Sequence, residues 1–255
     1  MCKIEKNSRK EVSLMKKETK SSSVTLPQIE FTLNHAHGKE YLLAVGGRAP
    51  SSDWLREAAK QRTLWAVDRG LDSILSAGLT PELLIGDGDS ASPEAWQKAV
   101  SAHIPAERFP VEKDFTDTDL ALKKIKAESP SAFVVMTGGF GGRFDHAFTT
   151  LYSFALSGIA GCIADDKECL LIADGPCELE ITCLRRPSAV SLLPLSSEAH
   201  GVSFSGVHWP LENSMLFQAK TLTVSNRLAE DTDTCRLSIS KGLIGIYFVW
   251  DEAGL

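Results

Sequence analysis

The chain has 255 residues, of which 43% are hydrophobic and 24% charged, an ordinary globular balance that fits one large domain or two modest ones. A net charge of −6 argues against a protein that coats nucleic acid, and no apolar run approaches the about 20 residues of a membrane span. The basic N-terminus is not followed by the apolar stretch of a secretory signal. Six cysteines without a CxxC spacing indicate reduced thiols. We therefore expect a cytoplasmic protein with no nucleic-acid or membrane partner.

The charges are unevenly distributed along the chain. Residues 1–22 carry seven Lys or Arg and three Glu, so the remainder carries a net charge of −10. Eight of the 15 aspartates lie between Asp68 and Asp145. A surface that needed only solubility would spread its acids, so this clustering suggests a site.

Residues 1–28 are rich in Lys and Ser and lack periodicity, which predicts a disordered basic tail. From residue 40 to residue 160, short apolar runs alternate with helical stretches, which predicts a parallel sheet with helices on its faces. The predicted strands are 41–45, 63–67, 83–85 and 132–136. The predicted helices are 53–61 with Ser52 as N-cap, 71–77, 93–101 with Ser92 as N-cap, 117–127 and 145–157.

From about residue 161, short apolar or alternating runs recur every 8–12 residues between turn residues, which predicts an all-β domain, a sandwich or a barrel. We place the domain boundary between residues 158 and 168. The predicted strands are 169–173, 177–184, 190–195, 202–207, 215–217, 221–224, 235–239 and 244–250.

The segment Gly86-Asp87-Gly88-Asp89-Ser90 follows a buried strand. Ligands of open parallel sheets bind beyond the carboxyl ends of the strands. Two crowded carboxylates need a counter-charge, and Mg²⁺ binds through one or two carboxylates plus substrate phosphates. A plain surface turn is the alternative, because Asp and Gly both favour turns.

Two further segments carry chemistry. One is an acidic segment before and at the start of a helix, with Lys113, Asp114, Asp117 and Asp119. Asp117 or Thr116 fits the N-cap of this helix, so the acids of the segment could serve capping or catalysis equally well. The segment 138–146 has four glycines in its first five positions and then Arg143, which together suit a phosphate, although a floppy loop is the alternative. A carboxylate cluster, a phosphate cradle and a cation together favour Mg²⁺-dependent phosphoryl-group transfer from a nucleoside triphosphate. The Walker motif of P-loop enzymes does not occur.

These motifs resemble those of the thiamine pyrophosphokinase family over about residues 41–250. The matching stretches are AVDRGLDSILSAGLTPELLIGDGDS, EKDFTDTDLAL, GGFGGRFDH, GVHWPLEN and LTVSN. The resemblance implies an N-terminal Rossmann-like α/β domain over 29–160 that binds ATP and Mg²⁺, and a β-sandwich domain over 161–255. It further implies a homodimer that makes thiamine diphosphate and AMP, with its active site at the subunit interface.

The resemblance also implies roles for individual residues. Asp87, Asp89 and Asp114 would bind Mg²⁺, and Asp117 would join them or position the thiamine hydroxyl. For the mechanism, we expect either Asp114 or Asp117 to take the proton of that hydroxyl. The residues expected to contact ATP are Asp68, Arg69, Gly70, Lys113, Thr116, Gly141, Gly142 and Arg143. The residues expected at thiamine are Asp145, Trp209, Ser225 and Asn226. Two positions depart from the family pattern: Arg69 stands where a glycine is usual, and Gly88 where an apolar residue is usual.

Two other functions remain open on the sequence. The DxD pair after a strand also fits a haloacid-dehalogenase-like phosphohydrolase with Asp87 as nucleophile, although Ala91 stands where that class has Thr or Val. A nucleotide sensor without catalytic activity is the second alternative, with the β domain as a partner-binding module.

Overall fold

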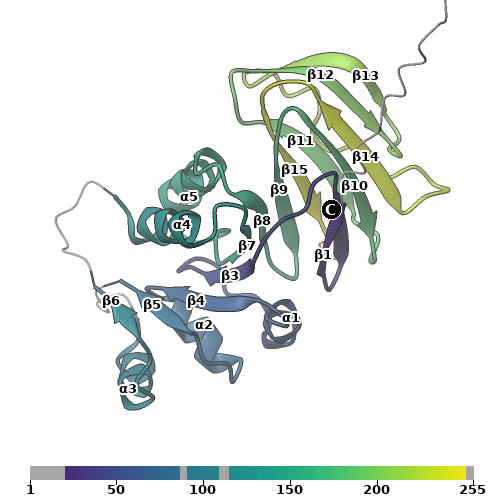
Figure 1. The fold of residues 1–255 in the computed structure, drawn as a ribbon. Coiled ribbons are helices and arrows are strands. Elements are labelled where there is room, and N and C mark those ends of the chain that lie inside the picture. The colour runs from purple at the N-terminus through teal and green to yellow at the C-terminus, as the bar shows by residue number, and fades with distance from the viewer. Residues whose placement is uncertain (1–20, 87–90, 109–114, 251–255) are drawn as a thin grey trace, which may run out of the picture.

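The computed structural model describes residues 21–86, 91–108 and 115–250, which form two sheets and five helices (Figure 1). In spatial order, the nine-stranded sheet contains β11 (Ala189–Pro194), β15 (Leu243–Val249), β9 (Glu168–Asp174), β8 (Ala160–Ala164), β7 (Phe133–Thr137), β3 (Glu40–Ala44), β4 (Thr63–Val67), β5 (Leu83–Ile85) and β6 (Ala106–Glu107). The six-stranded sheet contains β1 (Ser22–Leu26), β2 (Ile29–Leu33), β10 (Cys177–Cys183), β14 (Thr234–Ile239), β12 (Glu198–Ser205) and β13 (Leu211–Phe217).

The strands from β8 to β6 are parallel, as the alternation of strands and helices predicts. Helices α1 (Ser52–Ala58), α2 (Gly70–Ser76) and α3 (Pro93–Ser101) lie on one side of this part of the sheet, and α4 (Asp117–Glu128) and α5 (Phe144–Leu156) on the other (Figure 1). Successive residues of β3 point to opposite faces of the sheet and pack against the helices on each face. Leu42 packs in the core that includes α1 and α2, whereas Leu43 packs in the core that includes α4 and α5. Burial on both faces explains the continuous apolar runs of these strands.

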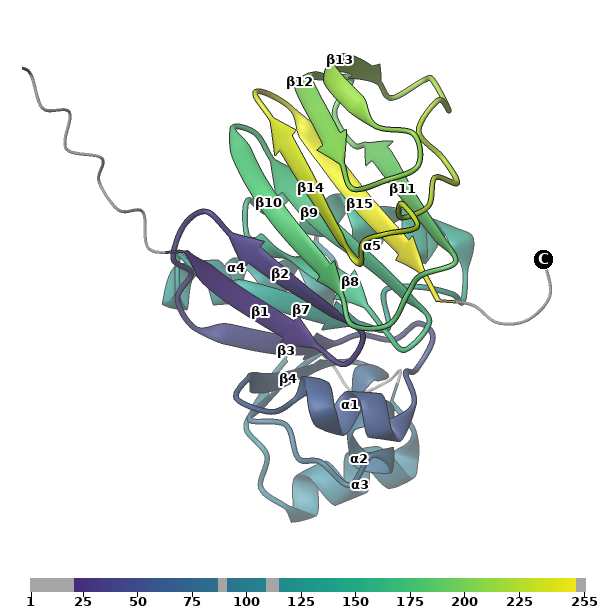
Figure 2. The same ribbon diagram turned by 90° about the vertical axis from the view of Figure 1, so that its right-hand side faces the viewer.

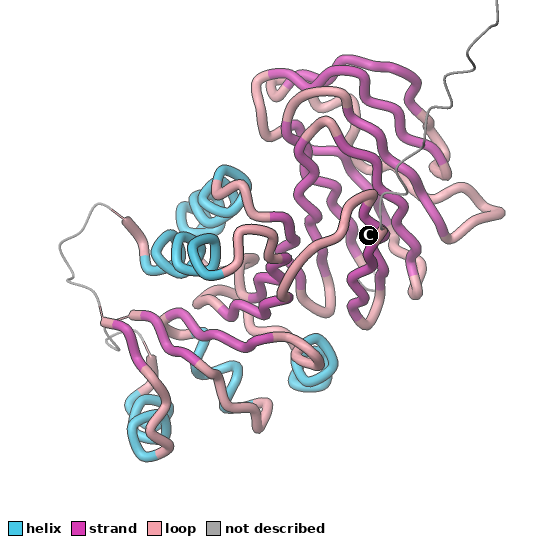
Figure 3. The backbone as a smooth tube through the Cα atoms, viewed as in Figure 1, coloured by secondary structure: helices cyan, strands magenta, loops and turns pink. Residues whose placement is uncertain are grey.

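The nine-stranded sheet does not end with its parallel part. Beyond β8, strands β9, β15 and β11 continue it in antiparallel fashion, and the six-stranded sheet packs against this extension (Figure 2). Leu171 and Ile246 of one sheet share a core with Ile181 and Leu237 of the other. Helices are confined to one end of the molecule and the C-terminal region is rich in strands (Figure 3). A mixed α/β fold with a β-rich C-terminal region is therefore confirmed. The expected boundary near residue 160 stays a prediction, because one sheet runs through it.

The N-terminal part of the described chain differs from the expected tail. Residues 22–33 form the hairpin of β1 and β2, which joins β10 of the C-terminal region. Alternate residues of the hairpin are buried, Val24, Ile29 and Phe31 among them, which is the two-residue period of a half-buried strand. A composition rich in Lys and Ser before residue 22 masked this alternation. Part of the expected tail and the first residues of the expected α/β domain therefore belong to the second sheet.

Three local features refine the sequence expectations. The N-cap of α1 is Ser51, not Ser52, because the Ser51 hydroxyl accepts the amide of Trp54. Ser92 caps α3, with Pro93 in the first turn, as predicted. Residues 221–224 form a turn, not a strand. Within the described ranges, no helix combines the length and apolar character that crossing a bilayer would need.

Candidate active site

A cleft opens where the strand order of the parallel sheet reverses. From β3 the chain adds β4, β5 and β6 on one side, then returns to add β7 and β8 on the other. The loops that leave the carboxyl ends of β3 and β7 run to helices on opposite faces, which leaves a crevice between them. A cavity of about 590 Å³ occupies this place, lined by the ends of β3, β4 and β7 and by the starts of α4 and α5. The cleft is the candidate active site.

Two glycine-containing loops form one wall of the cleft, backbone against backbone. The amide of Gly47 donates to the carbonyl of Gly138 at 2.8 Å, and the amide of Arg48 donates to the carbonyl of Phe140 at 2.6 Å. A Cβ atom on Gly47 would lie 2.2 Å from the Gly138 oxygen, so no side chain fits there. Gly141 and Gly142 also line the cleft, with φ angles of 70° and 71° that side chains rarely tolerate. We call residues 138–142 the glycine-rich loop.

The segment Asp68-Arg69-Gly70 connects β4 to α2 at the same end of the sheet. A Cβ atom on Gly70 would lie 2.0 Å from the carbonyl oxygen of Ala44, so this glycine lets α2 pack directly on the end of β3. The Asp68 carboxylate lies beside Gly86, where an added Cβ would be 2.0 Å from Oδ1. Asp68 and Arg69 both line the cleft. Asp68 therefore faces the end of β5, from which the predicted magnesium ligands follow in sequence.

Four of the predicted site residues lie outside the described residues: Asp87, Asp89, Lys113 and Asp114. Among the residues that the structure does describe, no three His, Cys, Asp or Glu side chains form a group that could hold a metal ion. The magnesium site expected at Asp87, Asp89 and Asp114 therefore stays a prediction.

The two acidic residues in the first turn of α4 have different roles: Asp119 caps the helix and Asp117 lines the cleft. Thr116 is the N-cap: its hydroxyl accepts the amide of Asp119 at 3.1 Å, and the Asp119 carboxylate accepts the amide of Thr116 at 3.0 Å. Partial burial opposes the charge of Asp119, but hydrogen bonds from Thr116 and Ser153 hold the pKa of its carboxyl below the ordinary value. Asp117 and Thr116 line the cleft. Asp119 is thus a capping residue, and Asp117 is the acid of this helix at the candidate site.

Arg143 and Asp145 meet in an exposed, two-pronged ion pair at the start of α5. Nη2 of Arg143 lies 2.5 Å from Oδ2 of Asp145, and Nε donates to Oδ1 at 3.1 Å. The hydrogen bond from Arg143 lowers the pKa of the Asp145 carboxyl. Arg143 also lines the cleft. Because the pair is exposed to solvent, an anionic ligand can replace the carboxylate on the guanidinium at little cost.

The residues predicted to contact thiamine in the β-rich region lie together. The side chain of Asn226 accepts the Trp209 amide at 3.2 Å and donates to the Trp209 carbonyl at 2.9 Å. Neighbouring Ser225 adopts a φ of 62° and donates its amide to Ser191. The Trp209 side chain is 56% exposed, so it is not a core aromatic. None of these three predicted residues is among the described residues that line the cleft.

Sequence reasoning missed several described residues of the cleft wall. Gly46 and Gly47 follow a buried strand, as the other site glycines do, and that pattern could have identified them. His146 was not missed: it is the last residue of the predicted segment 138–146, and it lines the cleft. Phe115 and Thr118 also line the cleft and lie within the quoted EKDFTDTDLAL motif, although no role is assigned to them. Thr149, Thr150 and Ser153 of α5 line it as well, and no pattern in the sequence singles them out.

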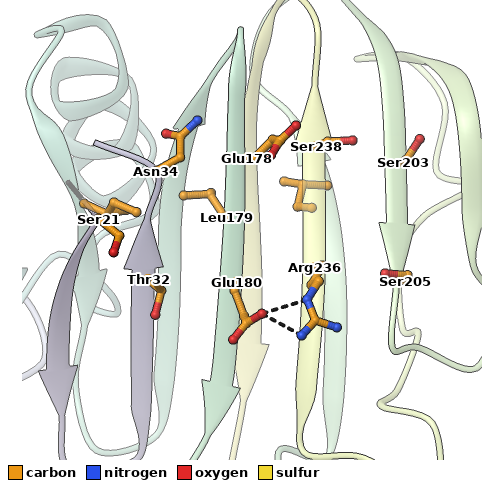
Figure 4. Close-up of a pocket in the computed structure, with 12 residues that line it drawn as sticks. Ser21, Thr32, Asn34, Glu178, Leu179, Glu180, Ser203, Ser205, Arg236 and Ser238 are labelled. Carbon is orange, nitrogen blue, oxygen red and sulfur yellow. Dashed lines mark hydrogen bonds and ion pairs between the residues drawn. The ribbon is translucent and has the colours of Figure 1, made fainter. Parts of the chain in front are cut away.

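A second hollow lies on the outer face of the six-stranded sheet (Figure 4). Leucine side chains and serine hydroxyls line it together, with an ion pair in which Arg236 bonds Glu180 at 2.6 and 2.7 Å. None of the described site residues predicted from sequence lines this groove. The cleft at the strand ends, not this hollow, therefore collects the described residues predicted to contact ATP, with the exception of Gly70: Asp68, Arg69, Thr116, Gly141, Gly142 and Arg143.

The comparisons with known proteins point to one family. Residues 55–158 match the model described as the thiamin pyrophosphokinase catalytic domain, and residues 178–244 match the thiamin pyrophosphokinase vitamin B1 binding domain. A thiamine pyrophosphokinase from Bacillus subtilis is 29% identical over 188 residues, which cover 72% of this chain and 86% of the relative. A thiamin pyrophosphokinase 1 from Caenorhabditis elegans is 27% identical and covers 79% of this chain and 83% of its own.

Solved structures agree in fold. A crystal structure of thiamine pyrophosphokinase from B. subtilis superposes with a TM-score of 0.73 at 25% identity, over 84% of this chain and all of that one. Yeast thiamin pyrophosphokinase shares the fold, with a TM-score of 0.65 at 14% identity, over 85% of this chain and 88% of its own. Since matches to a catalytic and a vitamin-binding model of one family together span most of the sequence, the chain belongs to the thiamine pyrophosphokinase family.

Proposed function

We propose that this chain is a thiamine pyrophosphokinase, an enzyme that transfers the diphosphate group of ATP to the hydroxyl of thiamine and releases AMP. Its membership of the family supports this activity. The observation that carries the proposal is the cleft at the reversal of the strand order, which brings Asp68, Asp117 and Arg143 together with the glycine-rich loop. We also infer that the parallel part of the sheet is a Rossmann-like nucleotide-binding unit, because its cleft lies where such units bind ligands.

The glycine-rich loop and Arg143 are proposed to hold the phosphates of ATP. Gly47 and Gly138 let the two loops pack backbone against backbone, so this wall of the cleft is built from main chain, which suits a phosphate chain. The buried hydroxyl of Thr137, directly before the loop, has no hydrogen-bond partner among the described residues. Arg143 would release the Asp145 carboxylate and bind two phosphate oxygens in its place. Arg69, at a position where glycine is usual in the family, adds a second cation to the cleft wall.

A divalent cation fits the acidic side of the same cleft. We propose Mg²⁺ with Asp87, Asp89 and Asp114 as its ligands, and the position of Asp68 beside Gly86 supports a cluster of carboxylates at the end of β5. When bound, the ion would neutralise the charge of the transferring diphosphate. The thiamine hydroxyl would attack the β-phosphorus in line, and Asp114 or Asp117 would accept its proton. The other residues act by positioning and electrostatic stabilisation.

We propose that the enzyme works as a homodimer whose thiamine pocket is shared. Trp209, Ser225 and Asn226 do not line the cleft of their own chain, so a second copy would bring them to it. Large apolar side chains are exposed on both surfaces that such a contact would use: Phe144 and Leu156 on α5 are 81% and 74% exposed, and Leu222 is 83% exposed. The Phe144 and Phe148 rings lie 5.9 Å apart, so part of the exposed apolar surface of α5 is contiguous, as is typical of protein interfaces.

Complementation between subunits tests the shared pocket. Asp89→Ala is expected to be inactive and Trp209→Ala to be weak at thiamine concentrations below its KM. A refolded mixture of the two would regain activity at these concentrations, because some dimers contain one intact site. A mixture no more active than its parts, or a monomeric wild type in analytical ultracentrifugation, would refute the shared site.

The activity itself is tested by incubating the protein with thiamine, ATP and Mg²⁺ and measuring AMP and thiamine diphosphate together. Equal amounts of both products support the proposal. Release of inorganic phosphate alone would instead favour the phosphohydrolase, and ATP binding without thiamine-dependent AMP would favour the sensor. We further propose a cytoplasmic location, which the free thiols of the five described cysteines support.

A further inference from the structure

Arg48 holds the back of the glycine-rich loop, although the sequence patterns do not mark it as a site residue. It follows Gly46 and Gly47 in the loop between β3 and α1. Its amide donates to the Phe140 carbonyl at 2.6 Å. A Cβ atom added to Gly141 would lie 2.9 Å from the Cβ atom of Arg48, so the loop rests directly on this residue.

The Arg48 side chain extends away from the cleft to the turn between β8 and β9. Nε and Nη2 donate to Oδ2 of Asp165 at 2.9 and 2.6 Å, and Nη2 also donates to Oε1 of Glu168 at 2.7 Å. The Asp165 side chain is 1% exposed. Its Oδ1 accepts two backbone amides of the turn, both at 2.9 Å. The guanidinium is therefore anchored on an acceptor that is itself fixed by backbone hydrogen bonds.

A closed ring of contacts connects this anchor back to the loop. The Phe140 ring lies 5.8 Å from Cζ of Arg48 and meets the ring of Tyr247 edge-on at 6.2 Å. The Tyr247 hydroxyl donates to Glu168, which completes the circuit through Arg48. Because Phe140 belongs to the glycine-rich loop, the loop is tied through its ring and its carbonyl to the β-rich region.

We propose that Arg48 is a positioning residue that fixes the backbone of the glycine-rich loop and so sets the affinity of the cleft for the phosphates of ATP. This inference rests on the proposed function, because it takes the loop to be the phosphate cradle. Arginine suits the role and lysine does not, since only the planar guanidinium fork bonds both carboxylates while lying over the Phe140 ring. A misplacement of about 1 Å at such a loop can cost about a hundredfold in rate.

The test compares wild type, Arg48→Met and Arg48→Lys in two assays. Isothermal titration gives the Kd for ATP with Mg²⁺ in the absence of thiamine, and steady-state kinetics give kcat and both KM values. Arg48→Met is expected to raise the Kd and the KM for ATP about tenfold while leaving the KM for thiamine within about twofold. Arg48→Lys is expected to restore little of this loss. Arg236→Met is the matched control, because it removes an arginine–carboxylate pair from the outer face of the other sheet.

Arg48→Met leaves the buried Asp165 without its cation, which can prevent folding. Tyr247→Phe is therefore the second variant, since it removes only the hydrogen bond to Glu168 and is expected to raise the Kd for ATP about threefold. Wild-type ATP affinity in folded Arg48→Met or in Tyr247→Phe would overturn the inference, as would an equal loss in Arg236→Met. A wild-type protein that binds ATP but releases no AMP with thiamine refutes the proposed function alone. The Kd comparison then still decides the role of Arg48.

Discussion

Replacing Gly47 with alanine tests the backbone contact that shapes the cleft. The added Cβ atom would lie 2.2 Å from the Gly138 oxygen and 2.6 Å from the Phe140 oxygen, far inside van der Waals contact. Both atoms are backbone, so the glycine-rich loop must move by about 1 Å to admit the methyl group. That movement lengthens two backbone hydrogen bonds, one from Gly47 and one from Arg48.

The cost can be estimated from these two contacts. Two neutral hydrogen bonds contribute about 1–3 kcal/mol together, which bounds the expected loss in the free energy of unfolding. A loop displaced by about 1 Å predicts a fall in kcat/KM for ATP of about a hundredfold, or about 2.7 kcal/mol of transition-state stabilisation.

Steady-state kinetics of AMP release and urea unfolding measure the two effects. Gly78→Ala is the control, because Gly78 has a φ of 72° but no atoms within 4 Å of the place that a Cβ atom would take. Its variant should lose about 1–2 kcal/mol of stability through backbone strain and keep the activity of the wild type. A folded Gly47→Ala enzyme with wild-type kcat/KM for ATP would refute the reasoning that this contact positions the loop.

Three further predictions follow from other parts of the chain. Trp209→Ala should raise the KM for thiamine about two- to thirtyfold and leave the Kd for ATP unchanged, because an exposed aromatic face suits the thiazolium cation; equal changes in both constants would contradict this. Asp119→Ala should lose about 1 kcal/mol of stability at pH 7. The pKa of Asp119 is lower in the folded protein than its ordinary value of 3.8, so the carboxylate stabilises the fold above that pH and loses this effect as the pH falls further. The difference between wild type and variant in the free energy of unfolding, measured in urea, should therefore shrink below about pH 4. Burial raises the pKa of the Cys183 thiol to about 12, so labelling with iodoacetamide at pH 8 should spare Cys183 until the protein is unfolded; fast labelling of the native protein would show that this thiol is accessible.

Much of the candidate site could be predicted because its signals are local. Gly138, Gly141 and Gly142 stand directly after a strand, and their spacing marks a backbone that must approach a ligand closely. Thr116 is one of two N-cap candidates for the helix that follows, and the structure selects it through a capping box with Asp119. The comparisons confirm the family that these motifs indicated.

The missed contacts are those between distant segments. Arg48 and Asp165 are 117 residues apart, and neither belongs to a motif. Gly46 and Gly47 share the sequence pattern of the other site glycines, but the contact of Gly47 with Gly138 depends on β7 pairing with β3. The closeness of Asp68 to Gly86 likewise depends on β4 pairing with β5.

By itself, the sequence determined four of the six parallel strands that the structure describes and the helices around them, since burial on both faces demands continuous apolar runs and helix ends favour capping residues. The sequence did not predict β6 or β8. It also determined the clustering of aspartates that first suggested a site. Only the tertiary structure decided that β1 and β2 pair with β10, that one sheet continues through the expected domain boundary, and that Arg48 anchors the glycine-rich loop. The physical reason is that the alternation of side chains along a strand decides which face of that strand is buried. The neighbouring strand with which it pairs, and the charged group that an arginine meets, depend on how distant parts of the chain pack together.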